Sequence, residues 1–266
     1  MEQSEASTTE HPFAGDPLWL FKYRSLEGPY GRDTARDIIL HNRMYWQSPA
    51  SFNDPFDCAP TVQWSMSKLR QESFISQAAR SSISSSRYDR RVQKREIRAR
   101  GRRQNAILMR DSLRDLLKSS AVTCFSSLPD SVLMWAHYAN SHKGICFVFH
   151  ERLDPNPWLA FDVKYEKDRP IIEGTRTFDE QSFEDAVLTK AIDWEYEREK
   201  RMVDYGSPPG HRKFPPEVLC GVIFGAKMST DDRKFVEGLL SQSPLNLKQY
   251  DAKISDTHFA LEIAQI

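Results

Sequence analysis

Short apolar runs recur along the chain, and most of them have the length and composition of β-strands. Several are rich in branched and aromatic residues and are bounded by charged or turn-forming residues, which is typical of buried strands. The segment at 160–166 instead alternates apolar and polar positions, as a half-buried strand does. The expected strands are 18–25, 121–127, 145–150, 160–166 and 219–225, with closing strands at 245–254 and 258–266.

Longer amphipathic stretches predict helices between these strands. The segment 34–49 is expected to be a helix capped by Thr34 and followed by a strand, and 130–144 a helix that begins near Asp130 and ends at Gly144. Two further helices are expected within 178–197 and over 229–242. Strands outnumber helices at both ends and do not alternate regularly with them. The pattern therefore predicts an α+β fold with mostly antiparallel or mixed sheets and flanking helices.

One stretch, residues 66–118, differs from the rest because it has helical character and lacks proline. From Arg87 to Arg103 it carries nine basic residues against Asp89 and Glu96. Such a strip can bind a nucleic-acid backbone or an acidic partner, or it can be a solvated helical excursion. We interpret it as a basic helical insertion in a single domain spanning 18–266. The polar, acidic residues 1–17 are expected to form a disordered leader.

The length, charge and hydropathy of the chain limit the kinds of protein that it can be. The chain has 266 residues, and 37 basic side chains balance 37 acidic ones, so no overall field favours nucleic acid. No apolar run approaches the length of a membrane span, and the leader lacks the features of a signal peptide. We expect a cytoplasmic protein, or a delivered effector without a cleavable signal. The four cysteines are widely separated, which predicts buried free thiols and neither a disulfide framework nor a zinc site.

The stretch DWEYEREKR, residues 193–201, contains the most informative candidate chemistry. If its second half is a strand, Glu197 and Glu199 share a face with Arg201, because strand residues two apart point the same way. Two carboxylates held close raise each other's pKa and can divide acid, base and cation-stabilising roles. In a helix the two side chains would diverge. The plain alternative is a surface ion-pair cluster with Arg201.

Six blocks along the chain together match one known pattern. They are LFKYRS, FNDPFD, CFSS, MWAHYANSHKGICFVF, KAIDWEYEREKR and IFGAKMS, in this order. With them the chain resembles the bacterial family called domain of unknown function 2971, from about residue 18 to 240. The insertion falls where that resemblance leaves the sequence variable. The family name implies no chemistry.

A second, weaker resemblance concerns the order of motifs in ADP-ribosyltransferases. These enzymes carry an arginine on an early strand, a serine-bearing strand and then a Glu-x-Glu pair, which Arg24, Ser126 with Ser127, and Glu197 with Glu199 reproduce. The resemblance implies NAD⁺ as substrate, with Arg24 clamping its diphosphate and Ser126 shaping the ribose site. It also implies that Glu199 stabilises an oxocarbenium-like ribose while Glu197 orients the acceptor.

The segment MWAHYANSHKG adds aromatic candidates for the same site. Trp135 and Tyr138 are expected to stack on a nicotinamide or adenine ring, with Tyr23 beside Arg24, and His137 is a candidate acid or base near neutral pH. The plain alternative is a packed aromatic helix. His137 and His142 are five residues apart, which is the wrong spacing for two ligands on one helical face, so no metal is expected there.

The sequence thus favours an ADP-ribosyltransferase-like enzyme acting as a toxin, effector or phage-defence component, with a protein or nucleic-acid acceptor. A metal-dependent nuclease is the first alternative, in which Asp54 and Asp57 join the two glutamates around Mg²⁺ and Lys190 supports the phosphate. The second alternative is a non-catalytic module whose basic helix binds nucleic acid or protein. Neither the acceptor nor the oligomeric state follows from the sequence.

Overall fold

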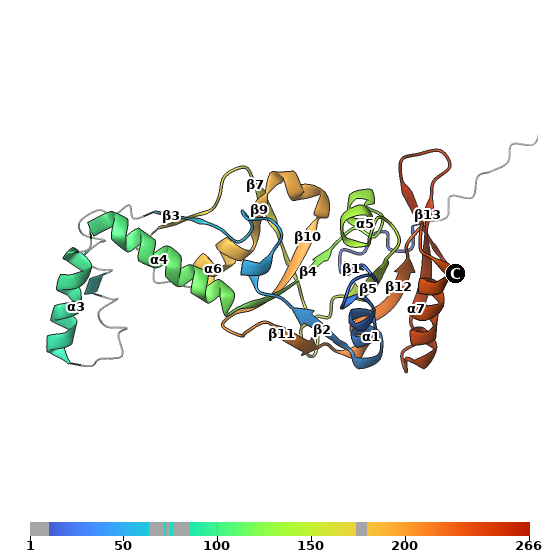
Figure 1. Ribbon diagram of the computed structural model, residues 1–266, viewed down its shortest axis with the longest axis horizontal. Helices are drawn as coiled ribbons and strands as arrows, with labels where there is room; N and C mark the ends of the chain where they lie inside the picture. Colours follow the sequence, from blue (N-terminus) through green and yellow to red (C-terminus); the bar gives the residue numbers. More distant parts are fainter. Residues whose placement is uncertain (1–10, 64–71, 73–74, 77–85, 100, 174–179) are drawn as a thin grey trace, which may run out of the picture.

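The computed structural model describes residues 11–63, 72, 75–76, 86–99, 101–173 and 180–266 (Figure 1). An eight-stranded mixed sheet is its largest element. All neighbouring strands are antiparallel except β12 and β13, which are parallel. This sheet confirms the expected α+β class. In spatial order its strands are β14 (Leu261–Gln265), β13 (Lys248–Ile254), β12 (Leu219–Phe224), β5 (Ile145–His150), β1 (Trp19–Arg24), β4 (Ala121–Ser126), β10 (Glu199–Asp204) and β6 (Phe161–Asp162).

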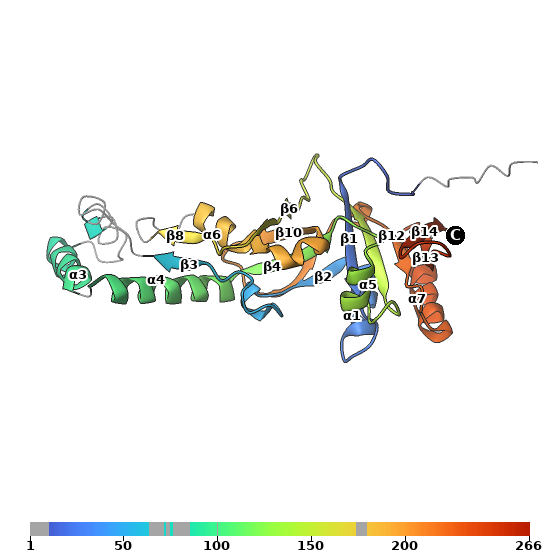
Figure 2. The same ribbon diagram turned by 90° about the horizontal axis from the view of Figure 1, so that it is seen from above.

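The sheet has two parts that meet at a narrow junction. β1 pairs with β5 along its whole length, and β4 pairs with β10 along its whole length. Between β1 and β4, however, the register contains a single pair, Phe21 opposite Ser126. Figure 2 shows β1 and β5 running across the direction of β4 and β10. The two strands therefore separate on one side of the Phe21–Ser126 pair, and this separation creates the site described below.

The part built on β1 and β5 is covered on both faces. Helices α1 (Gly31–His41) and α7 (Thr230–Gln242) pack on one face, and α5 (Val132–Tyr138) packs on the other. β5 shows the consequence, because Phe147 and Phe149 enter the core under α1 and α7 while Cys146 and Val148 enter the core under α5. A strand buried on both faces is a continuous apolar run, which is why ICFVFH lacks alternation.

The part built on β4 and β10 packs against a separate apolar cluster. Helices α4 (Gly101–Lys118) and α6 (Glu180–Val187) contribute Leu113, Leu117, Phe183 and Val187, which meet Val122 of β4. Helix α3 (Arg87–Ala99) precedes α4 in the chain, and Figure 1 shows α3 and α4 extending away from the large sheet.

Short elements complete the described chain. The two-stranded pairs are β2 (Arg43–Trp46) with β11 (Gly210–Lys213), β3 (Thr61–Gln63) with β8 (Ile171–Glu173), and β7 (Lys164–Glu166) with β9 (Thr189–Ala191). Three 3₁₀ helices are η1 (Pro49–Ser51), η2 (Ile192–Glu197) and η3 (Pro216–Val218). No helix within the described ranges combines the length and the apolar character that crossing a membrane requires.

Several expected boundaries are corrected. The first helix begins at Gly31 with Tyr30 before it, so Thr34 lies inside α1 and caps nothing. The expected strand 160–166 is split at Val163, whose N–H donates to the carbonyl of Glu199 while the next residue turns to pair with β9. The expected helix within 178–197 ends at Val187, and a strand and a 3₁₀ helix follow.

The expected disordered leader, residues 1–17, is contradicted in its described part, residues 11–17, where Phe13 and Asp16 contact the sheet. Residues 1–10 lie outside the described residues. Phe13 is buried and meets Phe21 and Trp19 edge to face, with ring centroids 5.1 and 5.3 Å away. Asp16 lies 2.9 Å from Nε2 of His150. A single aromatic residue in a polar segment was too weak a pattern to predict this packing. The four cysteines are free; Cys58 and Cys146 are buried as expected, whereas Cys124 and Cys220 are half-buried.

Candidate functional site

A cavity of about 730 Å³ opens where β1 and β4 separate. Its walls come from the end of β1, the edge of β4, α1, the β2–β11 pair, the loop after η1 and the segment around η2. Cavities of about 300–1,000 Å³ are typical of small-molecule sites. Arg24, Ser126, Tyr138, Glu197 and Glu199 all line it, so residues from four separate segments converge on one space.

The two glutamates reach this cavity by a route that the sequence did not predict. Glu197 is the last residue of η2, and Glu199 is the first residue of β10. Arg198 between them has φ 43°, a left-handed conformation that ends the 3₁₀ helix. The pair is therefore not a two-residue repeat on one strand. Both carboxylates nevertheless contact Lys190, so Glu197 and Glu199 lie in one site, although not as neighbours on one strand face.

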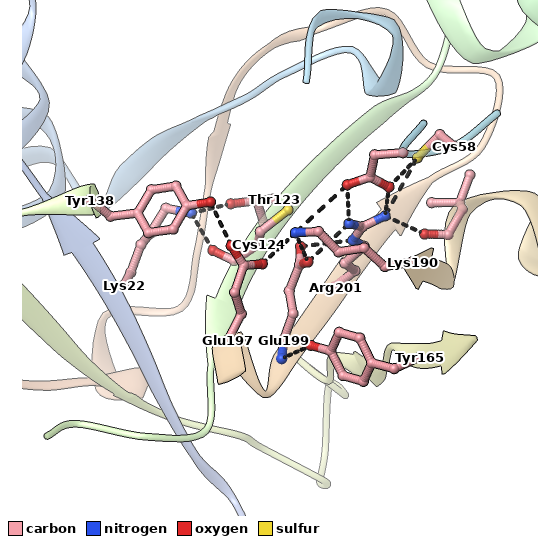
Figure 3. A network of polar contacts seen from close by, with 12 residues as sticks. Lys22, Cys58, Thr123, Cys124, Tyr138, Tyr165, Lys190, Glu197, Glu199 and Arg201 are labelled. Carbon is pink, nitrogen blue, oxygen red and sulfur yellow. Dashed lines mark hydrogen bonds and ion pairs between the residues drawn. The ribbon is translucent and has the colours of Figure 1, made fainter. Parts of the chain in front are cut away.

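The carboxylates belong to a buried ionic network, which we call the ionic cluster: Asp57, Lys190, Glu197, Glu199 and Arg201 (Figure 3). Arg201 is fully buried; its Nε and Nη2 donate to Glu199 at 2.8 and 2.9 Å, and its Nη1 and Nη2 donate to Asp57 at 2.9 and 2.7 Å. Lys190 contacts Glu197 and lies 2.9 Å from Glu199. The alternative of a surface ion-pair cluster is wrong, since all five side chains are buried.

Charge is not balanced inside the ionic cluster. Three carboxylates face two cations, so the formal charge is −1 when all five groups are ionised. Burying an ion is costly unless it is paired and hydrogen-bonded. In the ionic cluster, Arg201 and Lys190 provide the positive charges that pair with the three carboxylates. The backbone N–H of Glu199 also donates to the hydroxyl of Tyr165 at 2.7 Å, which fixes the start of β10.

The same surroundings separate the acidities of the two glutamates. Burial opposes ionisation of Glu199, but Arg201 and Lys190 outweigh it and lower the pKa of Glu199 to about 2. Burial raises the pKa of Glu197, and Lys190 and the Tyr138 hydroxyl offset it only in part. Burial, together with Glu197, also raises the pKa of Tyr138, so this phenol stays protonated and donates at 2.6 Å. One carboxylate is held ionised and its neighbour is more basic, as in paired acid–base sites.

The serine-bearing strand supports the backbone of the glutamate pair. The hydroxyl of Ser126 is buried, donates to the carbonyl of Glu197 at 2.6 Å and accepts from the N–H of Leu128 at 3.1 Å. Ser127 donates to the carbonyl of Arg198 at 3.3 Å and is not among the residues that line the cavity. Ser126 thus positions the turn between η2 and β10.

The aromatic candidates divide between core and cavity. Trp135 is fully buried, donates from Nε1 to the carbonyl of Pro129 at 2.9 Å and packs edge to face on Tyr23 at 5.2 Å. Tyr23 reaches the cavity but is itself buried, with its hydroxyl donating to a backbone carbonyl. His137 is exposed and lies beside Tyr196 outside the cavity lining. The structure brings Tyr138 to the glutamates and leaves Trp135 and His137 away from them.

Three contributors to the site were missed or placed in another role by sequence reasoning. The sequence predicts a role for Lys190 and Asp57 only in a nuclease, and it does not single out Lys22. Lys22 and Arg24 stand two apart on a strand and so share one face, and this spacing is the signal that could have identified Lys22. Nothing in the local sequence placed Asp57 beside Arg201, since that contact joins segments 144 residues apart.

The nuclease alternative receives little support from the same geometry. Asp54 accepts the N–H of Phe56 at 2.8 Å and so closes a local turn. The oxygens of Asp57 and Glu199 are taken by Arg201. Within the described ranges, no three His, Cys, Asp or Glu side chains are grouped to hold a metal ion.

Fold and site together define an α+β protein with a charged cavity at the junction of a split sheet. Residues 134–202 match the model of a family described as protein of unknown function (DUF2971). The match runs from α5 into β10 and contains Tyr138, Lys190 and both glutamates, and it confirms the expected resemblance over this stretch. No curated protein and no solved structure matches the chain.

Proposed function

We propose that this protein is an ADP-ribosyltransferase-like enzyme that cleaves NAD⁺ and transfers ADP-ribose. One observation carries the proposal. Arg24, Ser126, Glu197 and Glu199, which lie far apart in sequence and follow the motif order of such enzymes, line one cavity of suitable size. If the Glu-x-Glu pair had arisen by chance on a solvated surface, Arg24 and Ser126 would not be expected to line the same cavity.

The chemistry fits the charges of the site. When the bond between nicotinamide and ribose C1′ breaks, its electron pair leaves with nicotinamide and positive charge develops on the ribose. Glu199, held ionised by Arg201, and the net negative ionic cluster stabilise that charge. The acceptor then bonds to C1′, and its proton passes to Glu197, the more basic carboxylate. Tyr138 and Lys190 hold Glu197 in place.

The decisive assay is NAD⁺ consumption by purified protein, with EDTA and with a cell lysate as acceptor source. Wild type is compared with Glu197→Gln, Glu199→Gln and the control Glu195→Gln, which changes an exposed glutamate of the same 3₁₀ helix. We expect turnover that survives EDTA, falls by about 10²-fold or more in Glu197→Gln and stays at the wild-type rate in the control. Denaturation curves confirm that each variant is folded.

Absence of NAD⁺ turnover in every condition, or equal turnover in Glu197→Gln, would refute the proposal. Mg²⁺-dependent cleavage of nucleic acid would instead favour the nuclease.

The proposal also includes where the enzyme acts and which kind of molecule accepts the ADP-ribose. We place the enzyme in the cytosol, or in a target cell as a delivered toxin, effector or phage-defence component. Arg87, Arg91 and Arg95 are exposed at four-residue spacing on α3, and this basic row supports an acidic protein or nucleic-acid acceptor. Radiolabelled NAD⁺ in the lysate assay would show which of the two becomes modified.

A further inference from the structure

Among the residues that the structure describes, Lys22 and Arg24 are cations of the cavity without a carboxylate partner. We infer that Lys22 joins Arg24, to which the resemblance already gives this role, in a subsite that binds the phosphate-bearing part of the ligand. The inference rests on the proposed function only in taking this cavity as the substrate site. It adds Lys22 as a ligand-binding residue and divides the cavity into a phosphate end and a carboxylate end.

Lys22 has an unusual environment for a lysine. Its side chain is buried, with 3% of its surface exposed, and it lines the cavity. Its Nζ donates to Thr123 Oγ1 at 2.7 Å and to the carbonyl of Cys124 at 2.8 Å, and it lies 4.7 Å from the ring centre of Phe125. All three neighbours are neutral. Lys22 reaches β4 because β1 and β4 separate beyond the Phe21–Ser126 pair and leave this edge open.

Arg24 extends the same face of β1 by two residues. It is half-buried, and its Nη1 donates to the carbonyl of Tyr23 at 3.3 Å, which uses one of five possible donors. Among the residues that the structure describes, no carboxylate lies within 4.0 Å of the charged nitrogens of Lys22 or Arg24. Lys190 and Arg201, in the same region, each contact at least two carboxylates.

The cavity is therefore polarised. Two unpaired cations lie along β1, and the ionic cluster with formal charge −1 lies around η2 and β10. A ligand with a phosphate group and a centre of positive charge complements both ends. A diphosphate fits better than a carboxylate because each of its two phosphates carries a negative charge, so that it can match two cations. A guanidinium also binds phosphate oxygens in bidentate fashion.

The surroundings of Lys22 favour an anionic ligand. Burial lowers the pKa of Lys22 well below its ordinary value, Arg24 lowers it further, and Glu199 with the thiols of Cys124 and Cys146 opposes this in part. An unpaired buried ammonium is costly, and a bound phosphate supplies the missing counter-charge. Phosphate binding should therefore raise the pKa of Lys22.

Isothermal titration calorimetry tests the subsite with ADP, pyrophosphate and adenosine. We expect ADP and pyrophosphate to bind, and adenosine to bind much more weakly than ADP. Lys22→Met should weaken ADP binding by about tenfold to a hundredfold, whereas Lys248→Met, an exposed lysine on β13, should not change it. Lys22→Arg should keep more ADP affinity than Lys22→Met, because arginine retains the positive charge.

The alternative is that Lys22 only caps the open edge of β4. Equal ADP affinity in wild type and Lys22→Met, or no binding of ADP and pyrophosphate by wild type, would overturn the inference. If Lys22→Met does not fold, Arg24→Met decides, because ADP affinity equal to that of wild type in this variant would also overturn the subsite. ADP binding that depends on Lys22 without NAD⁺ turnover would keep the subsite and refute the transferase. NAD⁺ turnover with unchanged ADP affinity in Lys22→Met would do the reverse.

Discussion

Replacing Arg201 by methionine should destabilise the protein strongly, and the reason lies in what the substitution leaves behind. Arg201 is fully buried and donates two hydrogen bonds to Glu199, two to Asp57 and one to the carbonyl of Val187. Methionine fills much of the same volume without charge. Asp57 and Glu199 would then share only Lys190 as a cation, so the formal charge of the ionic cluster would change from −1 to −2.

The expected cost follows from measurements on buried ion pairs. Removing one partner of such a pair costs about 3–5 kcal/mol, because the remaining charge stays buried without compensation. This is a large part of the roughly 5–15 kcal/mol that stabilises a typical domain. The control is Arg36→Met, which removes an exposed i,i+3 pair with Asp33 and should change stability by about 0.5 kcal/mol or less.

Urea denaturation of Arg201→Met, Arg36→Met and wild type, from pH 7 to pH 3, measures this effect. The pKa of Glu199 is lowered from 4.5 to about 2 in the folded protein, so its stabilisation is present above pH 4.5 and is lost as the pH falls toward 2. Without Arg201 the pKa of Glu199 rises. The stability difference between wild type and Arg201→Met should therefore be largest at pH 7 and shrink below pH 4.5. A loss under about 1 kcal/mol at pH 7, or one that grows in acid, would refute the argument.

Other predictions use single contacts. Tyr138→Phe removes the hydrogen bond that lowers the pKa of Glu197, so the acidic limb of the pH profile of NAD⁺ kcat/KM should move to higher pH. Gly238→Ala places a methyl group in open space inside α7 and should raise the free energy of unfolding by about 0.5–1 kcal/mol in urea titrations. Gly144→Ala would put Cβ 2.2 Å from the carbonyl oxygen of Arg24 and should lower the free energy of unfolding by at least about 1–3 kcal/mol. Its control is Gly210→Ala, where nothing lies within 4 Å and the free energy of unfolding should hardly change. Equal effects of the two substitutions in urea titrations would contradict the overpacking argument.

Most of the fold was predictable because the core strands are continuous apolar runs. ICFVFH and LCGVIF are buried on both faces, so their assignment depended on length and composition alone, and β5 and β12 confirm it. The region after Val187 was not predictable in the same way. Its amphipathic pattern continues past the end of α6, but the chain there pairs with β7 and then forms η2. These structures depend on contacts with distant segments, which local propensity does not predict.

The candidate site was predictable in part, for a similar reason. Arg24, Ser126 and the two glutamates could be selected because their motif order is visible in sequence. The partners that set their charge states were not visible. Arg201 meets Asp57, Lys22 meets Thr123, and Tyr138 meets Glu197, and each contact depends on how distant segments pack. An arginine in a charged stretch reads as solvated, and only the fold shows that it is buried.

The left-handed backbone of Arg198 has a consequence for how this site can vary. Because the chain reverses its handedness between the two glutamates, the relative direction of their carboxylates depends on one φ angle of 43°. Glycine adopts that conformation freely, asparagine and aspartate adopt it at small cost, and β-branched residues do so only with strain. The side chain of Arg198 is exposed and pairs only with Glu195 at 3.6 Å among the described residues, so its charge is dispensable for the fold. Glycine or asparagine at position 198 should therefore preserve the fold, whereas valine or isoleucine should destabilise it. The residue between the two glutamates is thus restricted by its backbone conformation, although its side chain lies on the surface.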